Sequence, residues 1–167
     1  IPFAVVAADI ETGEEVVLKR GRVAEAIRAS CGLPLIFAPI HLNGRYLVDG
    51  GVVDYIPIDA ARLLGAQWVL ASITELDYTS SKPRSMLESL EQVIDIRGSI
   101  LSRAQRRAAN FLIEPQTPNL SLLDPSGNKA ALERGAIVAY RRLPAAQESL
   151  ILFSLASLSR RWSAPVP

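Results

Sequence analysis

A single carboxylate followed by two glycines is the group in this chain whose type and position best suit chemistry. Asp49 follows the apolar residues 46–48 and precedes Gly50 and Gly51. A strand that ends in Asp49 would place its carboxylate at the carboxyl end of the strand, where α/β folds commonly hold their sites. The sequence Asp-Gly-Gly also favours a turn. Because glycines have no side chain, they leave a neighbouring carboxylate accessible to a substrate or to a second side chain. The local pattern therefore supports a structural turn and a reactive acid alike.

Composition limits the classes of partner. The chain has 167 residues, 49% of them hydrophobic and 21% charged, which is typical of one globular domain. Eighteen basic and 17 acidic residues give a net charge of +1, so we expect no nucleic-acid partner. The single cysteine, Cys31, excludes an internal disulfide, and we see no metal-ligand cluster. We therefore expect no metal and no cofactor.

Hydrophobic runs indicate no membrane span. The longest apolar-rich run, residues 149–158, has 10 residues, about half of the roughly 20 that cross a bilayer. It is expected to form a core strand or a short helix. The amino terminus shows no secretion signal, although the chain opens on Ile1. The compartment stays open, with a cytoplasmic or peripheral membrane location favoured.

The first half of the chain predicts strands joined by tight turns. Residues 3–8 and 16–18 are apolar and β-branched around the turn-prone DIETGE, which predicts a hairpin. Residues 22–30 have helical spacing, and Pro34 follows. Asn43-Gly44 between two apolar runs predicts a second hairpin, whose second arm ends at Asp49.

The second half predicts alternating helices and strands. Pro57 could open a first helical turn, and QWVLASI then reads as a buried strand, giving an α/β alternation. Residues 86–101 predict a long amphipathic helix that Gly98 bends or weakens. Its later part is basic; we interpret it as a solvated helix face in preference to a membrane-surface or substrate-headgroup face. A polar loop at 78–84, a short strand FLIEP, a loop at 115–128 and a helix at 129–143 complete the prediction. No linker divides the chain, so a single domain spanning residues 1–167 is expected.

Three stretches in order carry a resemblance to a known family. They are PFAVVAADIETGEEVVLKRG, AEAIRASCGLPLIFAPI and GRYLVDGGVVDYIPIDAARLLGAQWVLA. Together they resemble the carboxyl-terminal half of bacterial patatin-like phospholipases, with the core of the resemblance over residues 2–71 and a helical tail over 83–143. The resemblance implies a three-layer α/β/α sandwich, of which this chain would be an incomplete, carboxyl-terminal portion. It also implies that Asp49 is the acid of a serine-aspartate dyad, with Gly50 and Gly51 in the loop that supports it.

The dyad chemistry that the resemblance implies needs a nucleophile. A serine hydroxyl attacks an ester only when a base takes its proton, here the carboxylate itself without a histidine. This fits a chain whose only histidine is His41. However, no serine here lies in a G-x-S-x-G context, and no glycine-rich oxyanion loop is present. Ser30 lacks both flanking glycines and reads as a packed residue at a helix end. Tyr55 stands near the position where many members have asparagine.

The resemblance therefore implies a lipid acyl hydrolase acting on a lipid or acyl-ester substrate, with its serine and oxyanion loop in an amino-terminal half of the same domain. Alone, the chain is expected to be inactive. It is also expected to self-associate, because strands without their central neighbours expose open edges. Peripheral membrane contact is compatible with such a substrate.

Two alternatives remain open at the sequence level. The first is a non-catalytic patatin-like module that binds or regulates, since the nucleophile motif is missing. The second is a Cys31-His41-Asp49 set within 19 positions. Reactive cysteines need an electropositive, accessible setting, and Cys31 follows a packed-looking helix, which disfavours this set.

Overall fold

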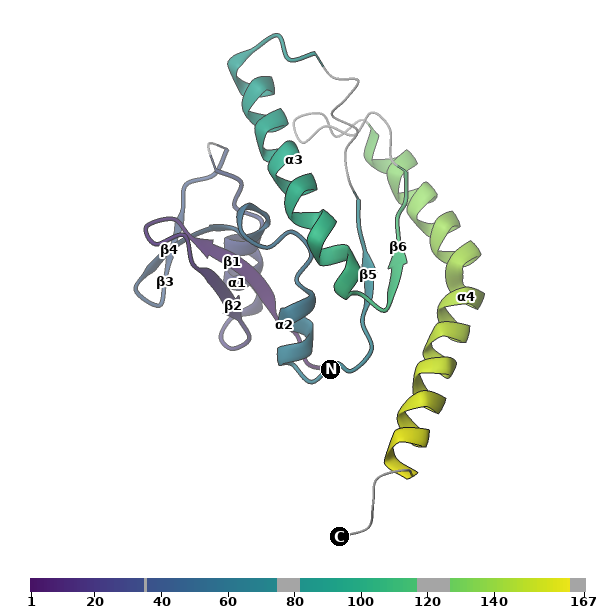
Figure 1. Ribbon diagram of the computed structural model, residues 1–167. Helices are drawn as coiled ribbons and strands as arrows, with labels where there is room; N and C mark the ends of the chain where they lie inside the picture. Colours follow the sequence, from purple (N-terminus) through teal and green to yellow (C-terminus); the bar gives the residue numbers. More distant parts are fainter. Residues whose placement is uncertain (35, 75–81, 117–126, 163–167) are drawn as a thin grey trace. The chain divides into compact units, whose positions relative to one another are not determined.

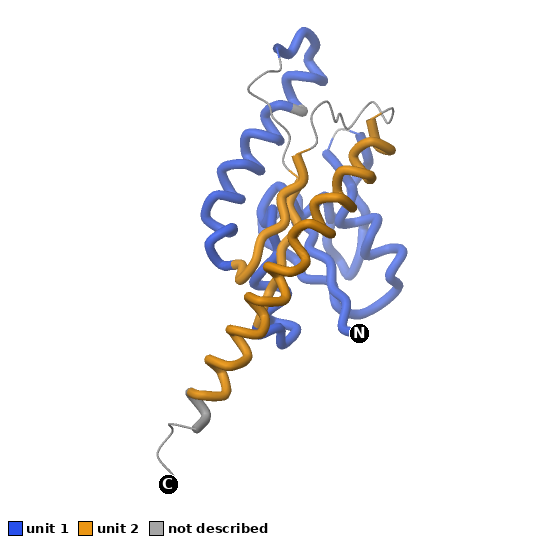
Figure 2. The backbone as a smooth tube through the Cα atoms, turned by 90° about the vertical axis from the view of Figure 1, so that its right-hand side faces the viewer, with its two compact units in different colours: residues 1–67, 77–108 blue, residues 68–76, 109–167 orange. Residues whose placement is uncertain are grey.

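The chain folds as a mixed α/β protein with two compact units. The computed structural model describes residues 1–34, 36–74, 82–116 and 127–162. One unit comprises residues 1–67 and 77–108, and the other comprises residues 68–76 and 109–167 (Figures 1 and 2). The predicted α/β class is thus confirmed. The three-layer sandwich and the single patatin-like domain stay predictions.

The first unit is built on a four-stranded antiparallel sheet. Its strands are β1 (Val5–Asp9), β2 (Glu15–Leu18), β3 (Ile40–Leu42) and β4 (Arg45–Asp49), in the order β2-β1-β4-β3 (Figure 1). Both predicted hairpins are confirmed. Asn43 and Gly44 have φ angles of 54° and 78°, the left-handed pair that a type I′ turn requires. The Asn-Gly pair therefore sets the register of β4 and with it the position of Asp49.

Both faces of β1 and β4 are buried. Ala7 and Leu47 pack with Ala26 and Ala29 of α1 (Val23–Ser30), and Leu18 joins this core. Because strand residues alternate between faces, their neighbours point to the other side, where Val6, Ala8 and Val48 are also buried. This two-sided burial explains why consecutive residues, 6–8 in β1 and 47–48 in β4, are apolar.

The first unit also contains two further α-helices and two short 3-10 helices. They are η1 (Gly50–Val52), α2 (Ile58–Leu63), α3 (Met86–Gln105) and η2 (Arg106–Ala108). Pro57 is the residue before α2 instead of its first helical residue. The expectation that Gly98 bends or weakens α3 misses its main role. A Cβ at Gly98 would lie 2.5 Å from Cε2 of Tyr55, so the glycine makes room for that ring.

The second unit contains a parallel strand pair and a long helix. β5 (Leu70–Ser72) pairs with β6 (Phe111–Ile113), and α4 spans Asn128–Trp162. The guanidinium of Arg142 on α4 lies 4.8 Å from the ring centroid of Phe111, a cation–π contact. The predicted strand 67–73 is half-buried instead of fully buried: Ala71 is buried, whereas Leu70 is 39% exposed. β4 and β5 lie in different sheets, so the segment between them is not the crossover of one parallel sheet.

The last helix corrects two expectations. The sequence predicts a helix that ends at Leu143, before Pro144, and a separate core element at residues 149–158. Instead α4 continues through Pro144 to Trp162. An interior proline costs about 3 kcal/mol, which the strong helix formers on either side of it help to offset. The apolar side chains of residues 150–152, 155 and 158 are mostly exposed, so this run is not a core element.

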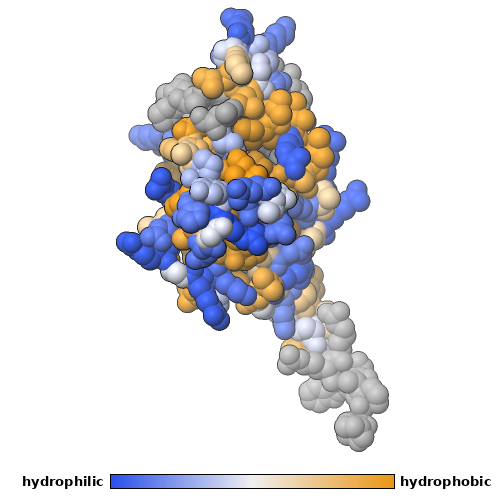
Figure 3. All heavy atoms as spheres, turned by 90° about the vertical axis from the view of Figure 1, so that its left-hand side faces the viewer, coloured by the Kyte–Doolittle hydropathy of each residue, from blue (hydrophilic) through white to orange (hydrophobic). Residues whose placement is uncertain are grey.

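Two predicted loops fall largely outside the described residues: 78–81 of the polar loop and 117–126 of the later loop. Among the described helices, none has the length and apolarity that a membrane span requires. The face shown in Figure 3 carries hydrophilic side chains across its middle and hydrophobic ones above them.

Candidate functional site

Asp49 is the last residue of β4, and its carboxylate is held by the turn that follows. Its backbone lies opposite Ala7 of β1, and its N–H donates to the carbonyl oxygen of Gly32 (3.0 Å). Its Oδ1 accepts a hydrogen bond from the backbone N–H of Gly51 at 2.7 Å, which caps η1. Since Asp49 and Leu47 are two residues apart on one strand, the carboxylate points to the same side of the sheet as α1.

The environment of Asp49 makes its carboxylate more basic. Burial raises the pKa of Asp49 above its ordinary value of 3.8, and the hydrogen bond from Gly51 only partly opposes this effect. A low-dielectric setting disfavours the charged form of an acid. A carboxylate with a raised pKa accepts a proton more readily, which is the property that a general base needs.

The two glycines have different physical roles. A Cβ at Gly50 would lie 2.4 Å from the carbonyl oxygen of Val6, so only glycine lets the turn pack directly on β1. A Cβ at Gly51 would lie 3.1 Å from Oδ1 of Asp49 and 3.7 Å from Cδ2 of Tyr55. Gly50 therefore serves the fold, whereas the absence of a side chain at Gly51 keeps one side of the carboxylate uncrowded.

A second carboxylate group lies in the same unit and was missed by sequence reasoning. Asp54 is only 7% exposed and accepts a hydrogen bond from Nε2 of Gln105 (2.6 Å). Together with Glu15 and Asp59 these residues line a cavity of about 260 Å³. Burial raises the pKa of Asp54 and of Glu15, and the neighbouring acids add to the effect. These residues come from distant parts of the chain, so no sequence motif indicates that they lie together.

The described residues do not complete a catalytic set around Asp49. Ser30 is half-buried at the end of α1, and in the described part of the chain no serine hydroxyl donates to the carboxylate of Asp49. His41 lies opposite Tyr46 with ring centroids 4.9 Å apart. Tyr46 and Asp49 are three residues apart, so they point to opposite faces of the sheet. The structure thus does not bring His41 to Asp49, which argues against the Cys31-His41-Asp49 set.

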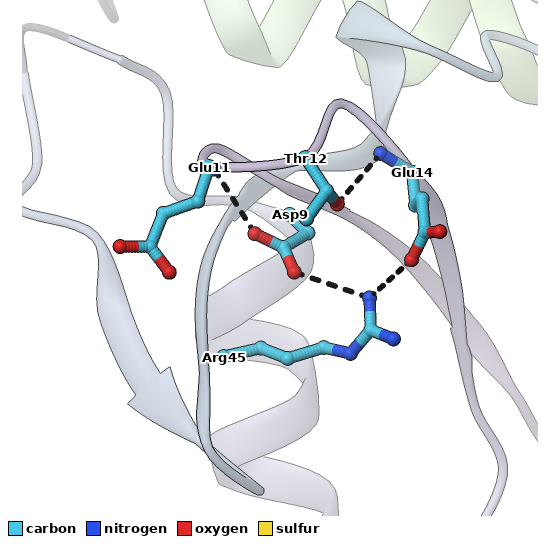
Figure 4. A network of polar contacts seen from close by, with 5 residues as sticks. All are labelled: Asp9, Glu11, Thr12, Glu14 and Arg45. Atoms are coloured by element: carbon cyan, nitrogen blue, oxygen red, sulfur yellow. Dashed lines mark hydrogen bonds and ion pairs between the residues drawn. The ribbon is translucent and has the colours of Figure 1, made fainter.

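A polar network at the far end of the sheet holds the hairpin turns (Figure 4). Nη1 of Arg45 donates to Asp9 (3.1 Å) and to Glu14 (2.7 Å), and the N–H of Glu11 donates to Asp9 (3.0 Å). Burial opposes ionisation of Asp9, but backbone hydrogen bonds from Glu11 and Thr12 and the charge of Arg45 outweigh it, so the pKa of Asp9 is lowered. The network joins the first hairpin to β4.

No metal centre is formed by the part of the chain that the structure describes. Among those residues, no group of three or more His, Cys, Asp or Glu side chains is arranged to hold a metal ion. Glu15, Asp54 and Asp59 line the acidic cavity together with Gln105.

Comparisons with known proteins concern the same region as the site. Residues 1–62 match the family model of the patatin-like phospholipases. An uncharacterized NTE family protein of Mycobacterium bovis is 43% identical over 58 residues, which is 35% of this chain and 16% of that protein. An uncharacterized NTE family protein of Mycobacterium tuberculosis is 25% identical over 168 residues, covering 86% of this chain and 29% of that protein. The chain thus spans less than a third of either relative. The segment that carries Asp49 is similar to patatin-like phospholipases.

Proposed function

We propose that this chain supplies the catalytic acid of a lipid acyl hydrolase, with Asp49 as the base of a serine-aspartate dyad. The nucleophilic serine and the oxyanion loop come from a segment outside residues 1–167, as the resemblance to patatin-like phospholipases implies. The observation that carries the proposal is the setting of Asp49: a half-buried carboxylate at a strand end, held by one backbone N–H, within the region that matches the family.

The chemistry follows from that setting. Oδ1 is engaged by the N–H of Gly51, and a carboxylate keeps further lone pairs that can accept a proton from a serine hydroxyl. The serine oxygen then attacks the ester carbonyl carbon, the ester C–O bond breaks, and the alcohol leaves with the proton. In the second half-reaction water gives its proton to the same carboxylate and attacks the acyl-serine carbonyl. The carboxylate then passes the proton to the serine oxygen as the acyl–serine bond breaks, which releases the fatty acid and the free serine. The raised pKa of Asp49 favours both proton transfers.

The test uses the complete protein and p-nitrophenyl esters of short fatty acids. We expect hydrolysis that a serine-directed phosphonate abolishes and that Asp49→Ala lowers by about 10³-fold or more, the scale of losing a dyad member. Asp49→Asn is the matched variant, because its side-chain oxygen can still accept from Gly51 while its amide cannot take a proton. Full turnover in Asp49→Asn would refute the role of Asp49 as the base.

A non-catalytic patatin-like module that binds or regulates is the alternative outcome. Absence of hydrolysis, together with absence of phosphonate labelling in the complete protein, would favour it. The phosphonate distinguishes the two cases because it labels an activated serine even when the ester chosen is a poor substrate.

A further inference from the structure

Helix α3 contacts the backbone that follows Asp49 at several points. Nε of Arg97 donates to the carbonyl oxygen of Val52 at 2.6 Å. Two turns along the helix, Gln105 contacts Asp54 and Ile56. Residues 52–56, the acid loop, are thus held along one side of α3.

The amide of Gln105 makes the most specific of these contacts. Its Nε2 donates to Oδ1 of Asp54 (2.6 Å), and its Oε1 accepts from the backbone N–H of Ile56 (2.9 Å). Both ends of one amide are therefore engaged, and the contact fixes which end is donor and which is acceptor. Asp54 is buried, so a partner of the wrong polarity would be costly there.

Tyr55 adds a packing contact between the acid loop and α3. Its Cε2 and Cδ2 atoms would lie 2.5 and 2.7 Å from a Cβ at Gly98. The ring therefore rests directly on the helix backbone. Tyr55 stands near the position where the sequence resemblance expects an asparagine, and its bulk is accommodated by a glycine 43 residues away in α3.

These contacts connect to Asp49 through a short turn. The N–H groups of Val53 and Asp54 both donate to the carbonyl oxygen of Gly50, at 2.9 and 2.8 Å. That turn presents the N–H of Gly51 to Oδ1 of Asp49. A displacement of Asp54 would therefore shift the group that orients the carboxylate.

We propose that Gln105 is a positioning residue for Asp49, acting through Asp54 and the turn at Gly50. This inference rests on the proposed function in so far as the positioned carboxylate is the catalytic base. Gln105 does not touch the reacting atoms. It holds the acid loop so that the N–H of Gly51 stays directed at the carboxylate.

The test inverts the polarity of the Gln105 contact in the complete protein. Gln105→Glu keeps an acceptor for the N–H of Ile56. It also places a second carboxylate next to Asp54, because Oδ1 of Asp54 lies 2.6 Å from Nε2 of Gln105. Asp54→Asn keeps an oxygen that Gln105 can donate to. The double variant Gln105→Glu/Asp54→Asn restores a donor–acceptor pair with the directions exchanged. Arg103→Gln, at an exposed site on the same helix, is the control.

Amide hydrogen exchange measures positioning without relying on activity. We expect Gln105→Glu to speed exchange of the Gly51 amide by about tenfold or more, which corresponds to about 1.4 kcal/mol. The amide of Asp9, bonded to the carbonyl of Glu14, should keep its rate, because the perturbation is local. The double variant should return the Gly51 rate to within about threefold of wild type, and Arg103→Gln should leave it unchanged. An unchanged Gly51 rate in Gln105→Glu, or no recovery in the double variant, would overturn the proposal.

Kinetics then separate positioning from the proposed function. We expect Gln105→Glu to lower kcat about 10- to 100-fold, the scale for misplacing a catalytic group by about 1 Å, with little change in KM and recovery in the double variant. Faster Gly51 exchange with unchanged kcat would overturn the catalytic part of the inference. Full hydrolysis in Asp49→Ala would instead refute the proposed function, while the exchange data would still decide whether Gln105 orients Asp49.

Discussion

Replacing Gly50 by alanine is expected to destabilise the first unit through one defined clash. The added Cβ would lie 2.4 Å from the carbonyl oxygen of Val6, 2.7 Å from its carbonyl carbon and 3.0 Å from its Cγ1. Real Cβ contacts essentially never fall below 3.0 Å, so the turn or β1 must move by at least 0.6 Å. The first two atoms belong to the backbone of a central strand, so no side-chain rotation relieves the contact.

The expected loss of stability combines the cost of overpacking in the folded state with the effect of alanine on the unfolded chain. Overfilling a packed interior costs about 1 to 3 kcal/mol. We expect Gly50→Ala to lie near the upper end of this range, because the atoms that clash belong to the backbone of β1 and cannot rotate away. Alanine also restricts the unfolded chain, which offsets about 0.4 to 1 kcal/mol. We expect a net loss of about 2 kcal/mol in the free energy of unfolding. With a urea m value of about 2 kcal/mol per molar, the midpoint falls by about 1 M.

Urea unfolding followed by circular dichroism measures this effect. Gly135→Ala is the matched control, because a Cβ there meets no atom within 4 Å and the site lies inside α4. That control should be neutral or stabilising by up to about 1 kcal/mol, since alanine favours helix more than glycine does. A Gly50→Ala protein within about 0.5 kcal/mol of wild type would show that the close approach to Val6 is not needed.

Three further expectations concern the site and its supports. Gly98→Ala should destabilise the first unit by about 1 to 2 kcal/mol in urea unfolding, because its Cβ displaces the ring of Tyr55; an unchanged midpoint would show that the ring moves aside freely. Arg45→Met should destabilise the protein above pH 3.8 and raise the pKa of Asp9 in a carboxyl NMR titration. The pKa of Asp9 is lowered in the folded state, so its stabilising effect is present above the unfolded value and is lost as pH falls through the folded value; a pKa unchanged by Arg45→Met would contradict this. Asp49→Asn should stabilise the protein at pH 7, because the pKa of Asp49 is raised in the folded state and its ionised form therefore opposes folding. This penalty is full above the folded pKa, shrinks as pH falls through it and is gone below the unfolded value of 3.8. A loss of stability in Asp49→Asn at pH 7 would contradict that sign.

Predictability differed between parts of the chain for identifiable reasons. The hairpins and α1 could be predicted because the Asn43-Gly44 turn and the apolar runs are local signals. The extent of α4 could not, because Pro144 is a strong local stop signal that the surrounding helix formers override. The assignment of β4 and β5 to different sheets also lay beyond the sequence, since strand partners are chosen by long-range packing.

The candidate site was likewise predictable only in part. The sequence by itself determined that Asp49 ends a strand and that glycines follow it, because strand periodicity and turn chemistry are encoded within a few residues. Only the tertiary structure decided that Gly50 is needed for contact with Val6. It alone also showed that Gln105 donates a hydrogen bond to Asp54, 51 positions away, and that the ring of Tyr55 packs against Gly98. Such pairs depend on how α3 packs against the acid loop, and no spacing in the sequence specifies that packing.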